Sequence, residues 1–189
     1  MVAGTHITIA NIVYKYLYNK LNFKLDWPSF SYGNILPDLD RTYVDCEHNI
    51  EDSLDTINCN ANELINSKVN NKEFSLGLGI ICHFICDYFC LYHTHEYQKE
   101  NLVTHVAYEG ALHANLLKKQ LKGGLNLRFK CKTEDSVELM VLKLRKKYIN
   151  ESKGIDTDIN FSVIAAVTIC EMITRKWLGY NAIKSNDQG

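Results

Sequence analysis

Residues that break helices are scarce in this chain of 189 residues, which contains only two prolines and ten glycines. Proline removes a helix hydrogen bond, and glycine costs about 1 kcal/mol relative to alanine inside a helix. Their scarcity leaves room for long helices, and amphipathic runs at helical spacing recur along the chain. The composition therefore predicts an all-α fold, formed as one domain with a sizeable core.

An excess of charge of either sign is also missing. The chain has 21 Lys and Arg against 22 Asp and Glu, a formal net charge of -1 and a pI of about 6.6. Proteins that bind nucleic acid or anionic lipid through a general basic field carry an excess of Lys and Arg. Nucleic acid is therefore not the favoured partner, although a local basic patch is compatible with this balance.

The N-terminal stretch lacks the features of a secretory signal. MVAGTHITIANIVYKYL has no basic first region, no long apolar region and no small-residue cleavage site. We therefore expect a cytoplasmic protein, or the already processed form of a secreted one.

The seven cysteines are odd in number, and Cys82, Cys86 and Cys90 are spaced four apart in one apolar run. Disulfides between consecutive turns of a helix are geometrically awkward, so reduced thiols in a reducing compartment are the simpler interpretation. Cys86 or Cys90 as a zinc ligand is less favoured, because histidines and carboxylates nearby supply enough ligands.

Apolar residues at helical spacing predict six helices. They cover residues 5–21, 46–67, 74–93, 102–121, 133–149 and 158–178. The glycines, prolines and aspartates of residues 22–46 predict a loop. Apolar and polar residues alternate over residues 125–132, which is compatible with an extended segment. We expect one domain over residues 1–180, followed by a flexible tail over residues 181–189.

The run over residues 74–93 is apolar enough to be compared with a membrane span. A spanning helix needs about 20 predominantly apolar residues, and this run carries His83 and Asp87 in its middle. We therefore expect the buried central helix of a soluble bundle and no transmembrane segment. Gly77 and Gly79 would let a neighbouring helix approach closely.

Metal-ligating residues recur at helical spacing between residues 83 and 109. His83 and Asp87 are four apart, His93 follows, and His105 and Glu109 are again four apart. Residues four apart share one helix face, so each pair can offer two ligand atoms to an ion. A buried carboxylate is also costly unless it is paired or bound to metal. The spacing predicts a site with more than one metal ion.

Three further candidates lie earlier in the chain: His6, Asp38 and His48. Taken alone, His6 is more simply an exposed residue at a helix start, and Asp38 a former of a turn. Together with the later residues they form a set of imidazoles and carboxylates that suits zinc, and next iron or manganese. The complete candidate set is His6, Asp38, His48, His83, Asp87, His93, His105 and Glu109.

Four segments resemble one known family. They are GTHITIANIV at residues 4–13, GNILPDLD at 33–40, HFICDYFCLYH at 83–93 and THVAYE at 104–109. These are similar to the first metal-binding helix, the aspartate loop, the H-x3-D-x5-H element and the H-x3-E element of the bacterial zinc-dependent phospholipase C family. That family includes phosphatidylcholine-hydrolysing enzymes and the catalytic domain of the alpha-toxin type.

The resemblance implies an all-α, multi-helix bundle with a buried trinuclear zinc site. Asp38, His48, His83 and Asp87 would hold one zinc ion. Asp87 would bridge to a second ion that also takes His6, and the third would use His93, His105 and Glu109. We expect two or three Zn²⁺ ions, a phospholipid or small phosphodiester substrate, and Asp38 as the catalytic residue that orients or deprotonates water.

The chain departs from the family in three places. Secreted members supply the amine and carbonyl of an N-terminal tryptophan to the zinc that binds the first histidine, whereas this chain has Met1. If Met1 is removed, Val2 would offer an amine instead. The membrane-binding β-sandwich of the toxin branch has no counterpart here, and the loop from Asp38 to His48 is shorter.

Two other functions remain compatible with these residues. The single-strand-specific zinc nucleases have a similar all-α, three-zinc architecture, and a non-catalytic metal-binding or scaffold protein would keep the same ligands. His95 and His113 are unassigned. Tyr88, Tyr92 and Tyr108 either line a pocket beside the ligands or belong to the helical core.

Overall fold

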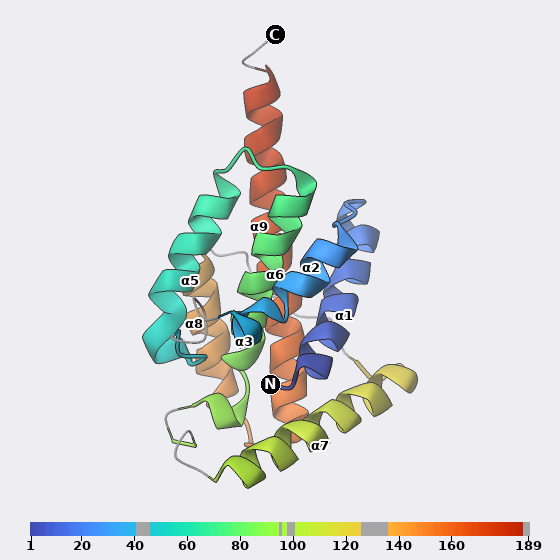
Figure 1. The fold of residues 1–189 in the computed structure, drawn as a ribbon, viewed down its shortest axis with the longest axis vertical. Coiled ribbons are helices and arrows are strands. Elements are labelled where there is room, and N and C mark those ends of the chain that lie inside the picture. Colours follow the sequence, from blue (N-terminus) through green and yellow to red (C-terminus); the bar gives the residue numbers. More distant parts are fainter. Residues whose placement is uncertain (41–45, 95, 98–100, 126–135, 187–189) are drawn as a thin grey trace.

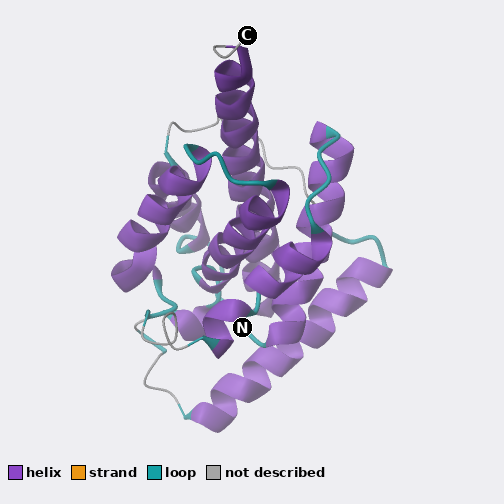
Figure 2. Ribbon diagram, turned by 45° about the horizontal axis from the view of Figure 1, so that its top comes forward, coloured by secondary structure: helices purple, strands orange, loops and turns teal. Residues whose placement is uncertain are grey.

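A computed structural model describes residues 1–40, 46–94, 96–97, 101–125 and 136–186. All regular secondary structure in these ranges is helical, which confirms the predicted all-α class (Figure 2). The helices are α1 (Ala3–Leu21), α2 (Trp27–Gly33), α3 (Leu36–Leu39), α5 (Ile50–Ile65), α6 (Asn71–Asp87), the 3₁₀ helix η1 (Leu91–His93), α7 (Leu102–Leu121), α8 (Val137–Tyr148) and α9 (Ile155–Asn186).

The predicted loop over residues 22–46 is partly helical, because it contains α2 and α3. The Asp26 side chain caps α2 by accepting a hydrogen bond from the Ser29 backbone N–H at 3.1 Å. Pro28 and Pro37 lie in the first turns of α2 and α3, where a missing N–H costs nothing. The sequence interpretation took these prolines as loop residues, although they begin short helices.

Helix α6 is the buried centre of the fold. Its start is fixed by a capping box between Asn70 and Glu73, and every residue from Leu78 to Asp87 is buried. The prediction of a buried central helix is therefore correct, but the helix ends at Asp87 and not at His93. Consequently Cys90 has an extended backbone and leaves the helical row of cysteines, and His93 lies on η1.

Helices α2 and α6 touch backbone to backbone at Gly33 and Gly79. A Cβ added to Gly79 would lie 2.4 Å from the Phe30 carbonyl oxygen, and one added to Gly33 would lie 2.4 Å from the Leu76 oxygen. Only glycine permits this approach. The predicted close packing therefore occurs at Gly79, and it brings the end of α2 against the part of α6 that carries His83.

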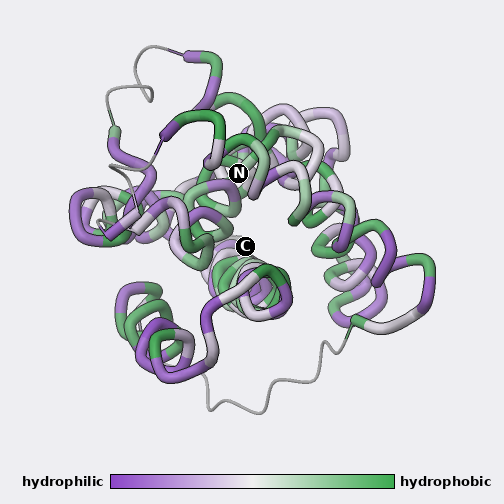
Figure 3. Tube along the Cα trace, turned by 90° about the horizontal axis from the view of Figure 1, so that it is seen from below, coloured by the Kyte–Doolittle hydropathy of each residue, from purple (hydrophilic) through white to green (hydrophobic). Residues whose placement is uncertain are grey.

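Helix α9 runs through the middle of the bundle and contacts α1, α5, α6, α7 and α8. Figure 3 shows it nearly end-on, with the other helices around it. By length and composition alone it could cross a membrane over Ile155–Ile183, but 67% of its most apolar window is buried in the protein. This burial fits a core helix.

Several predictions concern regions outside or at the edges of the described ranges. Residues 126–135, which include most of the segment expected to be extended and Cys131, lie outside them, as does His95. Helix α9 continues to Asn186, beyond the expected end at Leu178. The division into a domain over 1–180 and a flexible tail over 181–189 stays a prediction.

Candidate metal centre

The eight predicted ligands gather at the C-terminal end of α6, where Asp87 is the last helical residue. The first turns of α1 and α7 reach the same place, together with α3, η1 and the segment before α5. Figure 1 shows the N-terminus there, between α3 and α7. Four segments distant from α6 in sequence, together with η1 just after it, thus supply side chains to one cluster around α6.

Asp87 is the centre of this cluster. Its carboxylate is fully buried, and four imidazoles lie within 4 Å of it. The Oδ1 atom is 3.3 Å from His6 Nε2 and 3.6 Å from His93 Nε2, whereas Oδ2 is 2.9 Å from His48 Nδ1 and 3.3 Å from His83 Nε2. Asp87 therefore presents one oxygen to each of two groups of histidines, as a bridging carboxylate would.

On the α7 side, Glu109 joins two histidines. Its Oε1 atom lies 2.8 Å from His105 Nε2 and 3.0 Å from His93 Nε2. The Sγ atom of Cys90 is also within 4.8 Å of a His93 nitrogen and a Glu109 oxygen. The predicted i, i+4 pair of α7 thus faces His93, with a buried thiol behind it.

Asp38 closes the cluster on the opposite side. Its Oδ1 atom lies 3.5 Å from His83 Nε2 and 3.8 Å from His48 Nδ1. The three residues form one of four overlapping groups whose ligand atoms all lie within 4.8 Å of one another. This grouping agrees with the first zinc set that the resemblance implies.

The state of His6 shows that the cluster fits a cation. The side chain is fully buried and stacks on the His83 ring at a centroid distance of 3.9 Å. Its Nδ1 has no hydrogen-bond partner among the described residues, and its Nε2 meets Asp87 Oδ1 at 3.3 Å without hydrogen-bond geometry. A buried polar group without a partner is costly, and a divalent ion between His6, His83 and Asp87 would satisfy it. The set of imidazole nitrogens and carboxylate oxygens suits zinc.

A backbone carbonyl fixes the orientation of His83. The Nδ1 atom is 2.9 Å from the carbonyl oxygen of Asn34, which can only accept, so Nδ1 carries the proton and donates it. Nε2, which carries the lone pair in the neutral ring, faces Asp38 and Asp87. Metal-binding histidines commonly use their second nitrogen in this way. The contact between Gly33 and Gly79 places Asn34 for this role.

The pKa values of His6, Asp87 and Glu109 favour the forms that bind metal, whereas the hydrogen bond to Asp87 outweighs burial and raises the pKa of His48. Burial, together with the nearby His83, lowers the pKa of His6 to about 3. Burial acts to raise the pKa of Asp87, but His93 and the N-terminal amine outweigh it and hold that pKa well below its usual range. Burial also acts to raise the pKa of Glu109, but the hydrogen bond from His93 outweighs it and lowers that pKa to about 2. Neutral imidazole and ionised carboxylate are the forms that bind metal.

The α-amino group of Met1 lies inside the cluster, which sequence reasoning did not assign. It is 2.6 Å from Asp87 Oδ1, 2.8 Å from His93 Nε2 and 3.3 Å from Glu109 Oε1. Burial acts to lower the pKa of this amine, but the two carboxylates raise it to about 11. With Met1 present, the amine next to the ligands is that of Met1, and the hypothesis that Val2 supplies an amine after removal of Met1 stays a prediction. The N-terminal amine of the family was the only signal for it.

A second buried carboxylate supports the site from behind. Asp158 in α9 accepts hydrogen bonds of 2.8 Å from the Leu91 backbone N–H and from the hydroxyls of Tyr108 and Tyr148. Leu91 begins the turn that carries His93, and Tyr108 precedes Glu109. Sequence reasoning missed Asp158, because an aspartate in the first turn of a helix is typical of any helix start.

The remaining candidates divide between core and site. Tyr88 is buried and bonds Ser53 through its hydroxyl at 2.8 Å, so it belongs to the core. Tyr92 packs against the rings of Tyr108 and His105, beside the ligands.

His113 does not join the groups of ligand atoms. Its Nδ1 atom lies 3.3 Å from Thr5 Oγ1, and its ring lies over Gly4. His113 therefore packs α7 against α1.

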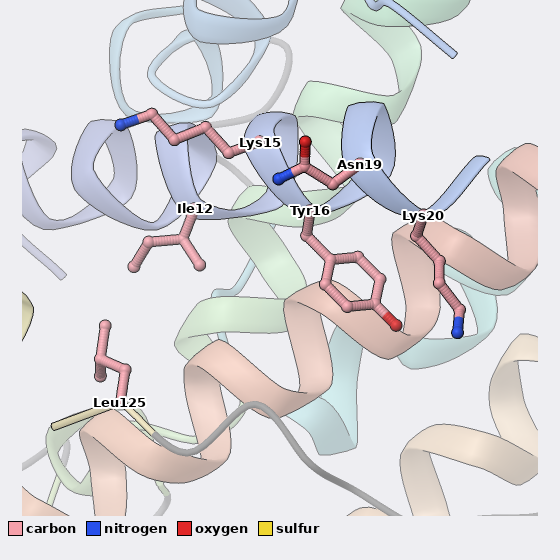
Figure 4. Close-up of a pocket in the computed structure, with 6 residues that line it drawn as sticks. All are labelled: Ile12, Lys15, Tyr16, Asn19, Lys20 and Leu125. Atoms are coloured by element: carbon pink, nitrogen blue, oxygen red, sulfur yellow. The ribbon is translucent and has the colours of Figure 1, made fainter. Parts of the chain in front are cut away.

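Two cavities among the described residues lie apart from these ligands. One of about 380 Å³ is lined by Ile12 and Tyr16 of α1, with Leu125 opposite (Figure 4). Another, of about 320 Å³, borders η1 at Leu91 and contains Arg145. Neither is lined by a predicted ligand.

Comparison with known proteins identifies one protein family that matches the chain. The model of the family described as zinc dependent phospholipase C matches residues 5–181. The match covers all eight predicted ligands and continues through most of α9. No curated protein and no solved structure matches the chain.

Proposed function

Because this chain belongs to the zinc-dependent phospholipase C family, we propose that it hydrolyses the phosphodiester bond of a phospholipid or of a soluble phosphodiester. One observation supports the proposal most strongly. Four imidazoles surround the buried carboxylate of Asp87, and one of them, that of His6, has no hydrogen-bond partner among the described residues. The Met1 amine supplies one positive charge there but leaves the His6 nitrogens unpartnered, and a bound metal ion would remove that cost.

The proposed ligand sets follow the resemblance and are supported by the distances. Asp38, His48, His83 and Asp87 would hold one zinc ion, and Asp87 would share a second with His6. The third set, His93, His105 and Glu109, is supported by the two contacts of Glu109 Oε1. Bound zinc would supply Lewis-acid chemistry, in which it polarises the phosphoryl oxygens and activates a water.

We assign the role of general base to Asp38. Its side chain is 34% exposed, whereas that of Asp87 is fully buried, so a water can reach Asp38 most easily. Its position beside His48 and His83 places it next to the proposed first ion. An Asp38 oxygen would accept the proton of the attacking water and hold that water in line with the phosphorus.

The first experiment combines metal analysis with three substrates. The protein is purified without chelator, its metal is quantified, and hydrolysis is followed with a chromogenic phosphocholine diester, a lysophospholipid and single-stranded DNA. We expect bound zinc and EDTA-sensitive hydrolysis of the phosphocholine diester. Cleavage of the DNA alone would favour a nuclease, and zinc without any hydrolysis would favour a non-catalytic metal-binding protein.

A matched pair of variants tests the role of Asp38. We expect Asp38→Asn to lower kcat by about 10²-fold or more, as for the loss of a general base. Asp40→Asn, two residues further along, changes the same type of side chain outside the four ligand groups and should keep activity near the parent level. Equal activity of the two variants would remove Asp38 from the mechanism.

The proposed location is the cytoplasm. All cysteines in the described part of the chain are free thiols, including the buried Cys82, Cys86 and Cys170. Free thiols support a reducing compartment.

A further inference from the structure

Large apolar side chains are exposed next to the metal centre. Leu102, Val103 and Val106 on the first turns of α7, and Leu39 on α3, each expose more than half of their surface. We call these four residues the rim patch. Scattered exposed leucines need no explanation, but a group beside a proposed active site does.

The rim patch lies where the metal centre opens to solvent. Among the predicted ligands, Asp38 and His105 have the most exposed side chains, at 34% and 29%. Leu39 directly follows Asp38 in the chain. Leu102 lies one turn before His105, and Val106 one turn before Glu109, so both share the face of α7 that carries these ligands.

The helices that carry the patch lie on two sides of the N-terminus. In Figure 1, α3 lies on one side of the N-terminus and the first turns of α7 lie on the other. The Met1 amine, in turn, contacts Asp87, at the centre of the cluster. A flat apolar layer laid across α3 and α7 would therefore cover the exposed ligands.

We propose that the rim patch inserts into the surface of a phospholipid layer and so presents the metal centre to the lipid phosphates. The inference rests on the proposed function, because a phospholipid substrate is held in such a layer. The patch continues directly into the side chains that would act on the phosphodiester. The near-zero net charge of the chain favours apolar contact over attraction to anionic lipid, so zwitterionic phosphatidylcholine is the expected surface.

The test compares two positions on one helix. The variant Leu102→Ser/Val106→Ser removes the α7 part of the rim patch, and both positions are exposed, so folding should survive. Leu121→Ser is the matched control, because Leu121 is also exposed but lies in the last turn of the same helix. Binding is measured by sedimentation with phosphatidylcholine vesicles, and activity with both vesicles and the soluble chromogenic phosphocholine diester.

We expect the double variant to bind vesicles about tenfold more weakly or worse, as expected for losing one or two buried aliphatic side chains. Hydrolysis of vesicle lipid should fall in parallel, while hydrolysis of the soluble diester stays within about twofold. The control should match the parent. Parent binding should change little between low and high salt.

Three results would overturn the proposal. They are unchanged vesicle binding of the double variant, equal weakening by Leu121→Ser, or a change from dimer to monomer in the double variant without loss of vesicle binding. The last would make the patch an interface between two copies of the chain. Vesicle binding needs no turnover, so absence of hydrolysis with patch-dependent binding would reject the proposed function alone.

Discussion

Asp87 and Asp158 are both fully buried aspartates, but their surroundings differ in kind. Asp158 accepts hydrogen bonds from one backbone N–H and two tyrosine hydroxyls, and these donors balance its carboxylate. Asp87 faces four imidazoles, whose nitrogens can each present a lone pair instead of a proton. Fixed donors complete the first site. At the second, the Met1 amine donates to Oδ1 of Asp87, and a metal ion could take up the imidazole lone pairs that remain.

The two carboxylates also differ in their pKa. Burial raises the pKa of Asp158, and its hydrogen bonds offset this only in part. At Asp87, His93 and the Met1 amine outweigh burial and lower the pKa well below its usual range. Asp158 thus stabilises a local structure, and Asp87 stays ionised in a form suited to a metal ion.

The largest expected effect is that of Asp87→Asn, which removes the proposed bridge. We expect loss of bound metal and of hydrolysis. At a metal concentration near 100 times Kd, loss of binding costs about 2.7 kcal/mol, or about 5–10 °C in Tm for a chain of this size. Metal analysis and calorimetry test this, and an unchanged metal content and Tm would contradict the bridging role. With EDTA present, the difference from the parent should shrink.

Asp158→Asn should give the next largest effect and should behave differently with EDTA. Replacing a charged acceptor that serves three donors costs about 1.5–3 kcal/mol. This loss is independent of metal, so the reduction in Tm should be as large with EDTA as without it. We also expect weaker metal binding, because Asp158 holds the turn that carries His93. A destabilisation that disappears with EDTA would place Asp158 in the same class as Asp87.

Gly79→Ala should have the smallest of the three effects. It should perturb the Asp87 cluster and leave the Asp158 site unchanged. The added Cβ would force α2 from α6 and move the Asn34 carbonyl away from His83, at a cost of about 1–2 kcal/mol. Metal affinity should fall about 10-fold, as is usual when the support of a ligand is lost. Gly110→Ala is the control, since its Cβ would meet nothing within 4 Å. Equal metal affinity of the two variants would show that the contact does not orient His83.

The sequence was sufficient for the fold class and for the residues that the structure brings together. The pairs His83/Asp87 and His105/Glu109 are local patterns, readable because a helix repeats every 3.6 residues. That these residues bind zinc stays a prediction. The supporting groups were not predictable, because a backbone carbonyl such as that of Asn34 carries no residue-type signal. Asp158 acts on Leu91 and Tyr108 only after the chain has folded.

Local structure was predicted less well where helices are short. The end of α6 at Asp87 and the turn at His93 are set by contacts with α9 and α7, and the apolar pattern continues through both. Similarly, Pro28 and Pro37 favour either a loop or a helix start, and the capping side chain of Asp26 decides for α2.

The position of the Met1 amine has a practical consequence for handling the protein. A purification tag fused ahead of Met1 would turn a basic nitrogen beside Asp87 and His93 into a planar, uncharged amide and would lead a peptide through the cluster. The C-terminal end of α9 instead projects away from the body of the molecule (Figure 1). Affinity handles and fluorescent fusions therefore belong after α9, where they leave the Met1 amine and its contacts unchanged.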